Sequence, residues 1–489
     1  MPKRFTGFSA DYHDAALSII NEDGVVEFAS HAERYTKHKN DFRIPESLWS
    51  HVDPSDHLSF YEDIDLKREL RLHYESESQN RRKRPDPDFC LGHHLSHCAG
   101  AFYTRPWNDR ESTVMVSIDG VGEHQTSVIL DNNFNVLQEK HLPKSVGFIY
   151  SAVTYLIGLR PLEDEYVVMG LSSYGNVDQE MLDWLIGWYN DLPDINPDVS
   201  VGIVIDDHGG FVTDQRNSAW GYLKDICKEK KRMPNDDIAA TTQAFAEYAI
   251  MDIMKEARKY GSKLVYSGGC AQNVVINSRL PELFDEVHIA VSPTDAGSSL
   301  GCAAHAWSQH TGKDRLIWTP YLGYNIDREV NPKEIVDHLL DKKVCGLANG
   351  RAEFGPRALG NRSLIADVRY DVKETVNNIK RRQQFRPFAP AILEEYADQY
   401  FEGPMNEYMQ YTSKALHDYK SVTHVDGTAR VQIVKKDCQS VFRKVIEEYH
   451  ERTGVPMLLN TSLNIRGRPM VNDEHDARLW EQKYKVKVF

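Results

Sequence analysis

TVMVSIDGVGEHQTSVIL, residues 113–130, is followed by the turn DNN and by FNVLQEK (134–140). Its aliphatic and β-branched residues predict a strand that returns through an Asn/Asp turn into a second strand. Residues 6–34 repeat the pattern with TGFSADYHDAALSII, the turn NEDG and VVEFASHAER. The repeat predicts a duplicated strand–turn–strand unit in the N-terminal part of the chain.

Such a duplicated unit fits the two-lobed, phosphate-handling fold of actin-like and sugar-kinase-like proteins. Further along, residues 236–259 have the apolar period of a long amphipathic helix. KLVYSGGCAQN (263–273) and VHIAVSPTDAGSSLGCAAHAW (287–307) each predict a strand that enters a glycine-containing loop. Strand–loop–helix units build α/β sheets whose ligands lie at the carboxyl ends of the strands.

A second domain is predicted after the turn-rich residues 315–333. A new unit begins near residue 334, its first strand is KVCGLANG, and its last helix covers 440–454. A chain of 489 residues is too long for one core. We therefore divide it into domains 1–325 and 326–489. Residues 181–235 show no clean period, and we interpret them as an insertion that shapes an acceptor pocket.

The bulk composition excludes several classes of protein. The net charge of −14 argues against non-specific nucleic-acid binding. No apolar run approaches the ~18–20 residues that span a bilayer, and the N-terminus lacks the apolar segment of a signal peptide. The seven cysteines are odd in number and form no CxxC pair, which argues against a disulfide framework and a structural zinc site. We expect a cytoplasmic protein without membrane contact.

Positive charge is concentrated in RAEFGPRALGNRSLIADVR (351–369) and KRRQQFRPFAP (380–390). Arginine grips phosphate or carboxylate in two places, and glycine lets the main chain approach a ligand. Several cations share a site only when they neutralise a polyanion such as a triphosphate. Some of these side chains could instead pair with the 72 acidic residues, and we expect at least one to do so. The candidate ligands of this polyanion are Arg357, Arg362, Lys380, Arg386 and Arg430, together with Asn460, Thr461 and Ser462.

LGHHLSHCAGAFY (91–103) places His93 and His97 four residues apart, on one face of a helix, while His94 points elsewhere. On spacing alone, packing or capping is the simpler interpretation of this pair. Asp119, at the end of an apolar strand, and Asp295, at a strand-to-helix loop, could complete a metal site. A His₂Asp₂ set with open positions suits Fe²⁺, our first expectation, or Mn²⁺ or Zn²⁺.

Two weaker patterns concern ligands in the first domain. Gly268 and Gly269 follow a strand and could turn backbone N–H groups toward phosphate, with Asn273 close behind, although a plain turn is the commoner meaning of such a pair. His13, which we place on the first strand, could accept a proton, and Lys39 follows further on. A lone histidine is usually structural.

Taken together, the motifs resemble those of one family. HHLSHCAGAFY, SIDGVGE, VMGLSSYG, SGGCAQN, PTDAGSSLG, EFGPRALGNRSLIAD, FRPFAPAIL, HVDGTARVQ and GVPMLLNTSLNIRGRPMV occur in this order. The chain resembles the ATP-dependent O-carbamoyltransferases of nodulation-factor and antibiotic biosynthesis (the NodU/CmcH type) over nearly its whole length. The resemblance implies an actin-like (ASKHA, two-lobed) domain followed by a YrdC-like domain, in α/β and α+β classes.

The resemblance also implies a mechanism. The YrdC-like domain would convert carbamoyl phosphate and MgATP into carbamoyl-adenylate. A hydroxyl of a small-molecule or nucleotide acceptor would then take the carbamoyl group at the metal site, and AMP would leave. His93, His97, Asp119 and Asp295 would bind the metal. Arg357, Lys380, Arg386 and Arg430 would hold the phosphates, with His13 and Lys39 near the acyl group and the acceptor.

Several points stay open at this level. Val167 stands where the family commonly has a lysine, in EDEYVVMGL, and the chain is compact for the family. A homodimer is compatible with the family's habit. Alternatives are a tRNA threonylcarbamoyl-transferase-like enzyme, which the acidic balance opposes, and a non-catalytic nucleotide-binding actin-like protein, which the His/Asp and Arg sets oppose. The identities of the acceptor and the metal are not encoded in these patterns.

Overall fold

The computed structural model describes residues 3–66, 84–192, 203–205, 211–213 and 233–489. The N-terminal part contains two five-stranded sheets. The first has the order β3-β2-β1-β4-β5 and the second the order β8-β7-β6-β11-β12. In each sheet the first three strands along the chain are antiparallel and the last two are parallel to their neighbours.

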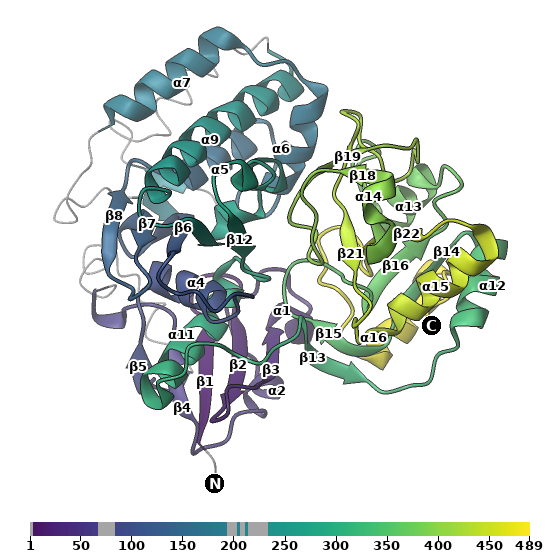
Figure 1. Cartoon of the computed structure of the whole chain (residues 1–489), viewed down its shortest axis with the longest axis horizontal. Helices are drawn as coiled ribbons and strands as arrows, with labels where there is room; N and C mark the ends of the chain where they lie inside the picture. Colours follow the sequence, from purple (N-terminus) through teal and green to yellow (C-terminus); the bar gives the residue numbers. More distant parts are fainter. Residues whose placement is uncertain (1–2, 67–83, 193–202, 206–210, 214–232) are drawn as a thin grey trace.

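The strands of the first sheet are β1 (Arg4–Ser9), β2 (Ala16–Asn21), β3 (Val26–His31), β4 (His57–Phe60) and β5 (Phe89–Cys90). Those of the second are β6 (Thr113–Gly122), β7 (Gln125–Leu130), β8 (Val136–His141), β11 (Lys263–Ser267) and β12 (Glu286–Ile289). The same topology thus occurs twice, in two lobes stacked one above the other (Figure 1). This duplication confirms the predicted actin-like, two-lobed α/β fold.

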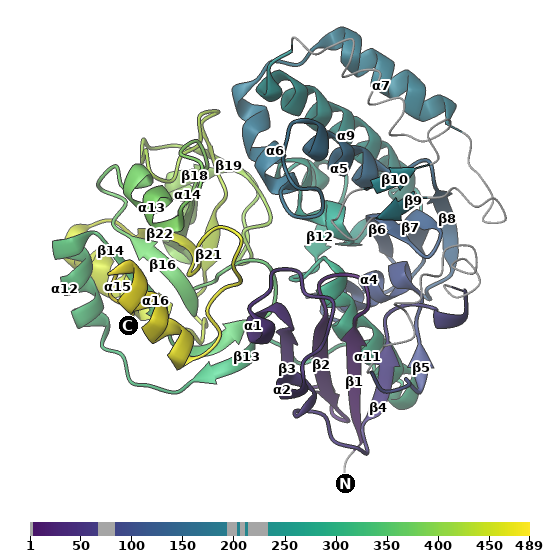
Figure 2. The same cartoon turned by 180° about the vertical axis from the view of Figure 1, so that it is seen from behind.

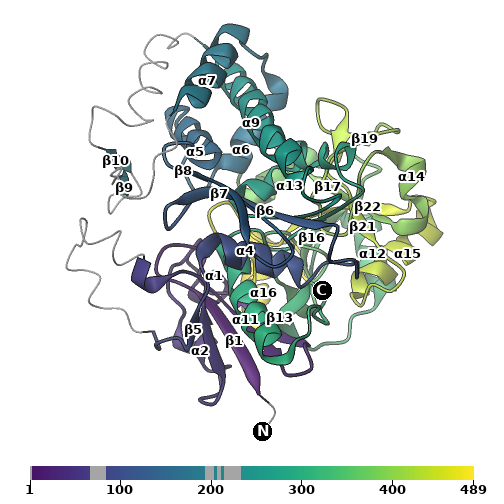
Figure 3. The ribbon, with the colours of Figure 1, turned by 60° about the vertical axis from the view of Figure 1, so that its left-hand side comes forward.

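Helices cover both lobes and fill the space between them. The longer ones are α4 (His93–Phe102), α5 (Val146–Leu156), α6 (Glu165–Leu171), α7 (Gln179–Asp191), α9 (Asn235–Ala257) and α11 (Asp295–Thr311). Shorter ones are α1 (Glu33–Thr36), α2 (Glu46–Trp49) and α10 (Val274–Asn277). Helix α9 confirms the amphipathic helix expected at 236–259. Helices α4 and α11 lie between the two sheets, at the centre of the molecule (Figure 3).

The C-terminal part is built on a third sheet of order β14-β16-β22-β17-β21, antiparallel except for the pair β17 and β21. Its strands are β14 (Val344–Ala348), β16 (Arg362–Ala366), β17 (Ala389–Leu393), β21 (Gln432–Val434) and β22 (Met457–Ser462). Helices α12 (Pro332–Lys342) and α15 (Val441–Thr453) share one apolar core with this sheet. Figure 2 shows both helices beside the sheet, from behind. Helices α13 (Lys373–Lys380) and α16 (Glu474–Tyr484) pack into a second apolar core of this domain.

The α/β prediction therefore holds for the C-terminal part as well, and α15 confirms the last helix expected at 440–454. Strand β13 (Tyr321–Ile326) pairs with β15 (Gly350–Glu353) where the chain passes between the two parts. A small sheet of β18 (Phe401–Glu402), β19 (Ser413–Ala415) and β20 (Thr428–Ala429), with α14 (Ala397–Tyr400) beside it, completes the domain. The domain boundary at 325 and the YrdC-like comparison stay predictions.

Two local predictions are wrong. Residues 6–20 and residues 113–130 are each two antiparallel strands rather than one, because the chain turns between Ser9 and Ala16 and again between Gly122 and Gln125. Asp11 and Asp14 have φ values of 81° and 50°, in the left-handed region that ends a strand. His13 consequently lies in this loop and not on a strand.

The interpretation of residues 181–235 as an acceptor-shaping insertion falls largely on residues outside those described. The described parts of that range are most of α7 and the short strands β9 (Ile203–Ile205) and β10 (Phe211–Thr213). Among the described residues, no helix is long and apolar enough to cross a membrane.

The close approach of α4 and α11 yields a stability prediction. A Cβ on Gly301 would lie 1.8 Å from the carbonyl oxygen of Ser96, whereas a Cβ on Gly187, in the exposed part of α7, would meet nothing within 4 Å. We expect Gly301→Ala to lower the free energy of unfolding by about 1–3 kcal/mol or more, because the helices must separate. Gly187→Ala should raise it by about 0.5–1 kcal/mol. Urea denaturation of both variants tests this, and equal effects would contradict the contact.

Candidate functional site

Two histidines and two aspartates from three elements converge at the centre of the actin-like part. His93 and His97 lie one turn apart on α4, Asp119 is near the end of β6, and Asp295 is the first residue of α11. The Nε2 atoms of the histidines are 3.1 Å apart. His97 Nε2 lies 3.2 Å from Asp119 Oδ2 and 3.4 Å from Asp295 Oδ1. For His93 Nε2 the corresponding distances are 3.9 and 3.7 Å.

This donor set fits a divalent metal ion. Ligand atoms that share an ion at ~2.1 Å lie roughly 3.0–3.4 Å apart, close to the separations in the cluster. Asp119 is held in place because its Oδ1 accepts the Gly120 N–H at 2.7 Å and its Oδ2 the Gly269 N–H at 2.8 Å. Asp295 is buried, and its Oδ2 accepts no hydrogen bond from the described residues. The structure thus brings together the four side chains predicted from the sequence, in an arrangement that could hold a metal ion.

Electrostatics favour the ligand forms of both carboxylates. Burial alone would raise the pKa values of Asp119 and Asp295, but the neighbouring imidazoles outweigh it and hold both pKa values below the usual range. The neighbouring His94 takes no part. Its Nδ1 is 2.8 Å from the Ser117 hydroxyl and its Nε2 is 3.0 Å from the Gln125 carbonyl. This placement agrees with the expectation that His94 points away from the cluster.

His13 and Lys39 lie beside this cluster. His13 Nδ1 is 3.3 Å from Asp14 and 3.8 Å from Asp295. Burial would lower its pKa, but the surrounding carboxylates, Asp295 first, raise the pKa to about 9. Lys39 Nζ donates to both carboxylate oxygens of Glu33, at 2.8 and 3.0 Å. Both side chains line the cavity described next.

One continuous cavity of about 470 Å³ reaches from the metal-type cluster into the C-terminal domain. Asp119 and Asp295 line it on the actin-like side. On the opposite side it is lined by seven cations. Arg466 and Arg468 lie in the loop after β22, and the other five are Arg357, Lys380, Arg382, Arg386 and Arg430. Asn460, Thr461 and Ser462 also line it, at the end of β22.

The last five of these cations lack carboxylate partners, since none of the described ion pairs involves them. Burial is the first cause that lowers their pKa values, and the mutual proximity of the cations adds to it. Lys380 donates instead to neutral oxygens of Ser462 and Asn464. Arg382 donates to Asn377 Oδ1 and to the Pro387 carbonyl. Such buried, unneutralised charge is what a polyanionic ligand would compensate.

Arg362 does not belong to this set, which corrects the sequence interpretation. Its side chain is fully buried at the start of β16 and is absent from the cavity lining. Its guanidinium donates to five main-chain carbonyls, those of Tyr324, Asn349, Gly350, Asn361 and Asn472. Arg362 thus links β13, the turn between β14 and β15, and the segment that precedes α16. The expectation that one arginine would pair with an acidic side chain is not met by Arg362, because its acceptors are carbonyls.

Gly268 and Gly269, which the sequence analysis placed against a phosphate, make other contacts in the structure. Gly268 has a φ of 88° and does not line the cavity, because its Cα packs against the Ile118 carbonyl of β6. Gly269 lines it and gives its N–H to Asp119. Asn273 lines it too, caps α10 through the Ile276 N–H and exchanges amide hydrogen bonds with Gln243. The loop therefore orients a carboxylate, and the nucleotide contact stays a prediction.

The sequence analysis missed some cavity residues. Arg382, Arg466 and Arg468 line the cavity, and the first lies within the quoted run 380–390. Its position there was a usable signal. Arg466 and Arg468 lie in the quoted motif GVPMLLNTSLNIRGRPMV, but no local pattern shows that this loop returns to the cavity. Val167 is buried in α6 and does not line the cavity.

Comparisons with known proteins identify the family. The family described as Carbamoyltransferase N-terminus matches residues 67–304, and Carbamoyltransferase C-terminus matches residues 336–489. Nodulation protein NolO of Bradyrhizobium diazoefficiens is 30% identical over 79% of this chain and 75% of its own length. The chain belongs to the carbamoyltransferase family, as the motifs predicted, and is a transferase of that class.

A further protein and a solved structure are also similar to this chain. Protein MJ1051 of Methanocaldococcus jannaschii is 30% identical over 96% of this chain and 94% of its own length. A structure of the activator of 2-hydroxyisocaproyl-CoA dehydratase from Clostridium difficile, with bound ADPNP, covers 63% of this chain and 96% of its own at 14% identity and a TM-score of 0.35.

The His/Asp cluster yields a metal prediction. We expect His97→Asn to reduce the affinity of the cluster for Fe²⁺, Mn²⁺ or Zn²⁺ by at least about 100-fold, because one of four ligands is lost. His57→Asn is the control, since His57 has a single carboxylate neighbour, Asp88, at 3.5 Å. Equilibrium dialysis with metal analysis measures both. Equal metal content in the two variants would exclude this cluster as a metal site.

The two kinds of arginine yield a second prediction. Arg430→Met removes an uncompensated buried charge, so the melting temperature without ligand should stay equal or rise, while stabilisation by tripolyphosphate should disappear. In the wild type, tripolyphosphate at 100 times its Kd should add about 2.7 kcal/mol. Arg362→Met should instead lower the free energy of unfolding by about 1–3 kcal/mol, since five carbonyls lose their donor. Thermal unfolding with and without tripolyphosphate separates the two, and the reverse pattern would overturn both assignments.

Proposed function

We propose that this chain is an ATP-dependent O-carbamoyltransferase that makes carbamoyl-adenylate in its C-terminal domain and uses it at the His/Asp cluster. The observation that carries the proposal is the single cavity lined at one end by unpaired cations and at the other by the cluster's two aspartates. Membership of the carbamoyltransferase family indicates that the transferred group is carbamoyl. The acceptor is a hydroxyl of a small molecule or a nucleotide.

The activation step takes place among the cations. Carbamoyl phosphate, MgATP and one water give carbamoyl-adenylate, inorganic phosphate and pyrophosphate. Carbamoyl phosphate, ATP, inorganic phosphate and pyrophosphate are polyanions, and Arg357, Arg386 and Arg430 line the place where their phosphates would lie. Fixed positive charges stabilise the negative charge that develops on the departing phosphate groups. Carbamate alone is a poor electrophile, so adenylation gives it the leaving group that transfer requires.

The transfer step takes place at the other end of the cavity. The acceptor oxygen bonds to the carbamoyl carbon, the bond from that carbon to the AMP oxygen breaks, and the hydroxyl proton leaves. When bound, a divalent cation at His93, His97, Asp119 and Asp295 supplies Lewis-acid polarisation of the carbonyl oxygen. His13 would exchange the proton, and Lys39, kept protonated beside Glu33, would hold the departing AMP phosphate.

The shared cavity supports a protected transfer. An acyl-adenylate hydrolyses when water reaches it, so an intermediate that stays inside one cavity is consumed by the acceptor instead. The cations and the cluster are contributed by different domains, which keeps the two half-reactions apart in space while they share one volume.

The proposal predicts that AMP and pyrophosphate form only when ATP and carbamoyl phosphate are both supplied. Labelled carbamoyl phosphate should add one HNCO unit of mass to one member of a panel of sugars, hydroxymethyl compounds and hydroxymethylated nucleotides. Arg430→Met should abolish pyrophosphate release, whereas His97→Asn should retain it and lose transfer, because the two residues serve different steps. An active wild type that never releases AMP with both substrates would refute the mechanism. Tight tRNA binding or metal-independent nucleotide binding without turnover would point to the alternatives.

A further inference from the structure

A second group of metal-type side chains lies at the edge of the upper lobe. His124 is in the turn between β6 and β7, and Glu139 and His141 are on the edge strand β8. Each offers one ligand atom, and the three atoms lie within 4.8 Å of one another. None of these residues lines the large cavity or belongs to the cluster of His93 and Asp119.

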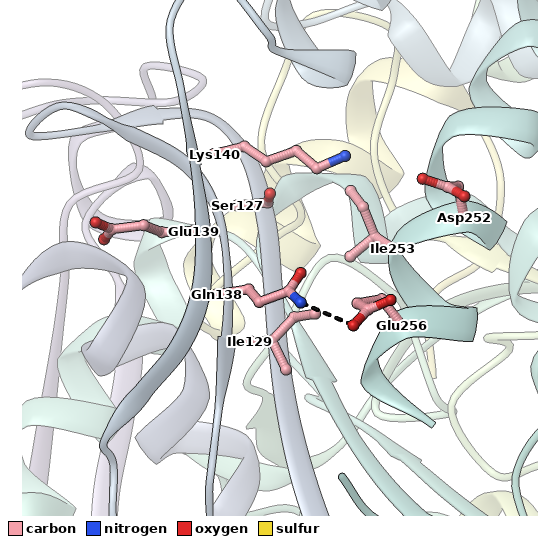
Figure 4. A pocket seen from close by; sticks show the side chains of 8 residues that line it. All are labelled: Ser127, Ile129, Gln138, Glu139, Lys140, Asp252, Ile253 and Glu256. Atoms are coloured by element: carbon pink, nitrogen blue, oxygen red, sulfur yellow. Dashed lines mark hydrogen bonds between the residues drawn. The ribbon is translucent and has the colours of Figure 1, made fainter. Parts of the chain in front are cut away.

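The strand arrangement brings the three side chains together. Glu139 and His141 are two residues apart on β8 and so share one face of the sheet. Gln138 and Lys140 point toward α9, around a cavity of about 190 Å³ in which Gln138 donates to Glu256. Glu139 also contributes to the lining of this cavity, but its carboxylate points to the opposite side of β8 from Gln138 and Lys140 (Figure 4). Gln125 pairs with His141 across the ladder, which sets the adjacent turn residue His124 beside it.

The three side chains contact one another within the group. The rings of His124 and His141 stack with centroids 5.1 Å apart and an interplanar angle of 19°. His141 Nε2 lies 3.5 Å from Glu139 Oε1. Nδ1 of His124 is buried and has no hydrogen-bond partner among the described residues. Burial first, and the neighbouring His141 second, lowers the pKa of His124.

We propose that His124, Glu139 and His141 form a second divalent-metal site, suited to a zinc-class cation and separate from the carbamoyl-transfer cluster. Two imidazole nitrogens and one carboxylate oxygen are a ligand set that holds Zn²⁺ with a position left open. The separations must shorten to roughly 3.0–3.4 Å around an ion. The exposed Glu139 side chain and the turn position of His124 allow this movement.

Occupation of this site would act on the turn between β6 and β7. Glu123, next to His124, accepts the His93 N–H at 3.1 Å with both carboxylate oxygens. A metal that joins the turn to β8 therefore fixes the residue that holds the first turn of α4. The expected effect is thermal stabilisation of the chain by Zn²⁺ even when the first cluster has lost a ligand.

The test is a count of bound Zn²⁺ per chain by equilibrium dialysis and metal analysis, with Zn²⁺ as the only added metal. The wild type should hold two ions. The His124→Asn/His141→Asn double variant should hold one, and His97→Asn should also hold one and still gain melting temperature from Zn²⁺. Glu139→Gln is the milder variant and should weaken the second site at least about tenfold. His57→Asn is the matched control and should hold two.

Two outcomes would overturn the proposal. One is a double variant, or Glu139→Gln if the double variant fails to fold, that retains two ions with wild-type affinity. The other is a His97→Asn protein that binds no zinc. Neither measurement depends on carbamoyl transfer, so the second site is tested independently of the proposed function.

Discussion

The contact between the backbones of α4 and α11 is the constraint on which the candidate site depends. Gly301 lies so close to the Ser96 carbonyl that no side chain fits between them, and a Cβ on Gly100 would lie 3.1 Å from the Gly297 carbonyl. Because the helices touch, His97 on α4 comes within 3.4 Å of Asp295, the first residue of α11. A larger residue at the contact would separate imidazole from carboxylate while leaving each helix intact.

Most of the cations at the C-terminal end of the large cavity are not neutralised by carboxylates, although Lys39 pairs with Glu33 at the other end and Arg466 pairs with Asp164. The aspartates are occupied by imidazoles and backbone amides, as Asp119 is by Gly269. The cations are held by neutral oxygens, as Lys380 is by Asn464 and Arg382 by Asn377. Without a ligand, the protein would be more stable if these buried charges formed direct ion pairs, because burying an unpaired charge is unfavourable. The arrangement keeps both ends of the cavity available for a ligand.

The sequence could predict those site residues whose signal is local. The spacing of His93 and His97 is a property of any helix, and Asp295 stands at a strand-to-helix loop that can be recognised in the chain. Arg362 and Arg382 show the limit, because both lie in arginine-rich runs with similar surroundings. Only the distant carbonyls of Tyr324 and Asn472 turn Arg362 into the interior, and no local pattern encodes them.

The loop at Gly268 and Gly269 shows why the kind of contact that a loop makes is easier to predict than the group that it contacts. A glycine loop after a strand was expected to offer backbone N–H groups to an anion, and Gly269 does donate its N–H. The anion is the carboxylate of Asp119, which comes from a neighbouring strand of the same sheet. The amide fixes Oδ2, which lies 3.2 Å from His97 Nε2. Because carboxylate and phosphate accept the same hydrogen bonds, only the strand order decides which of the two a glycine loop meets.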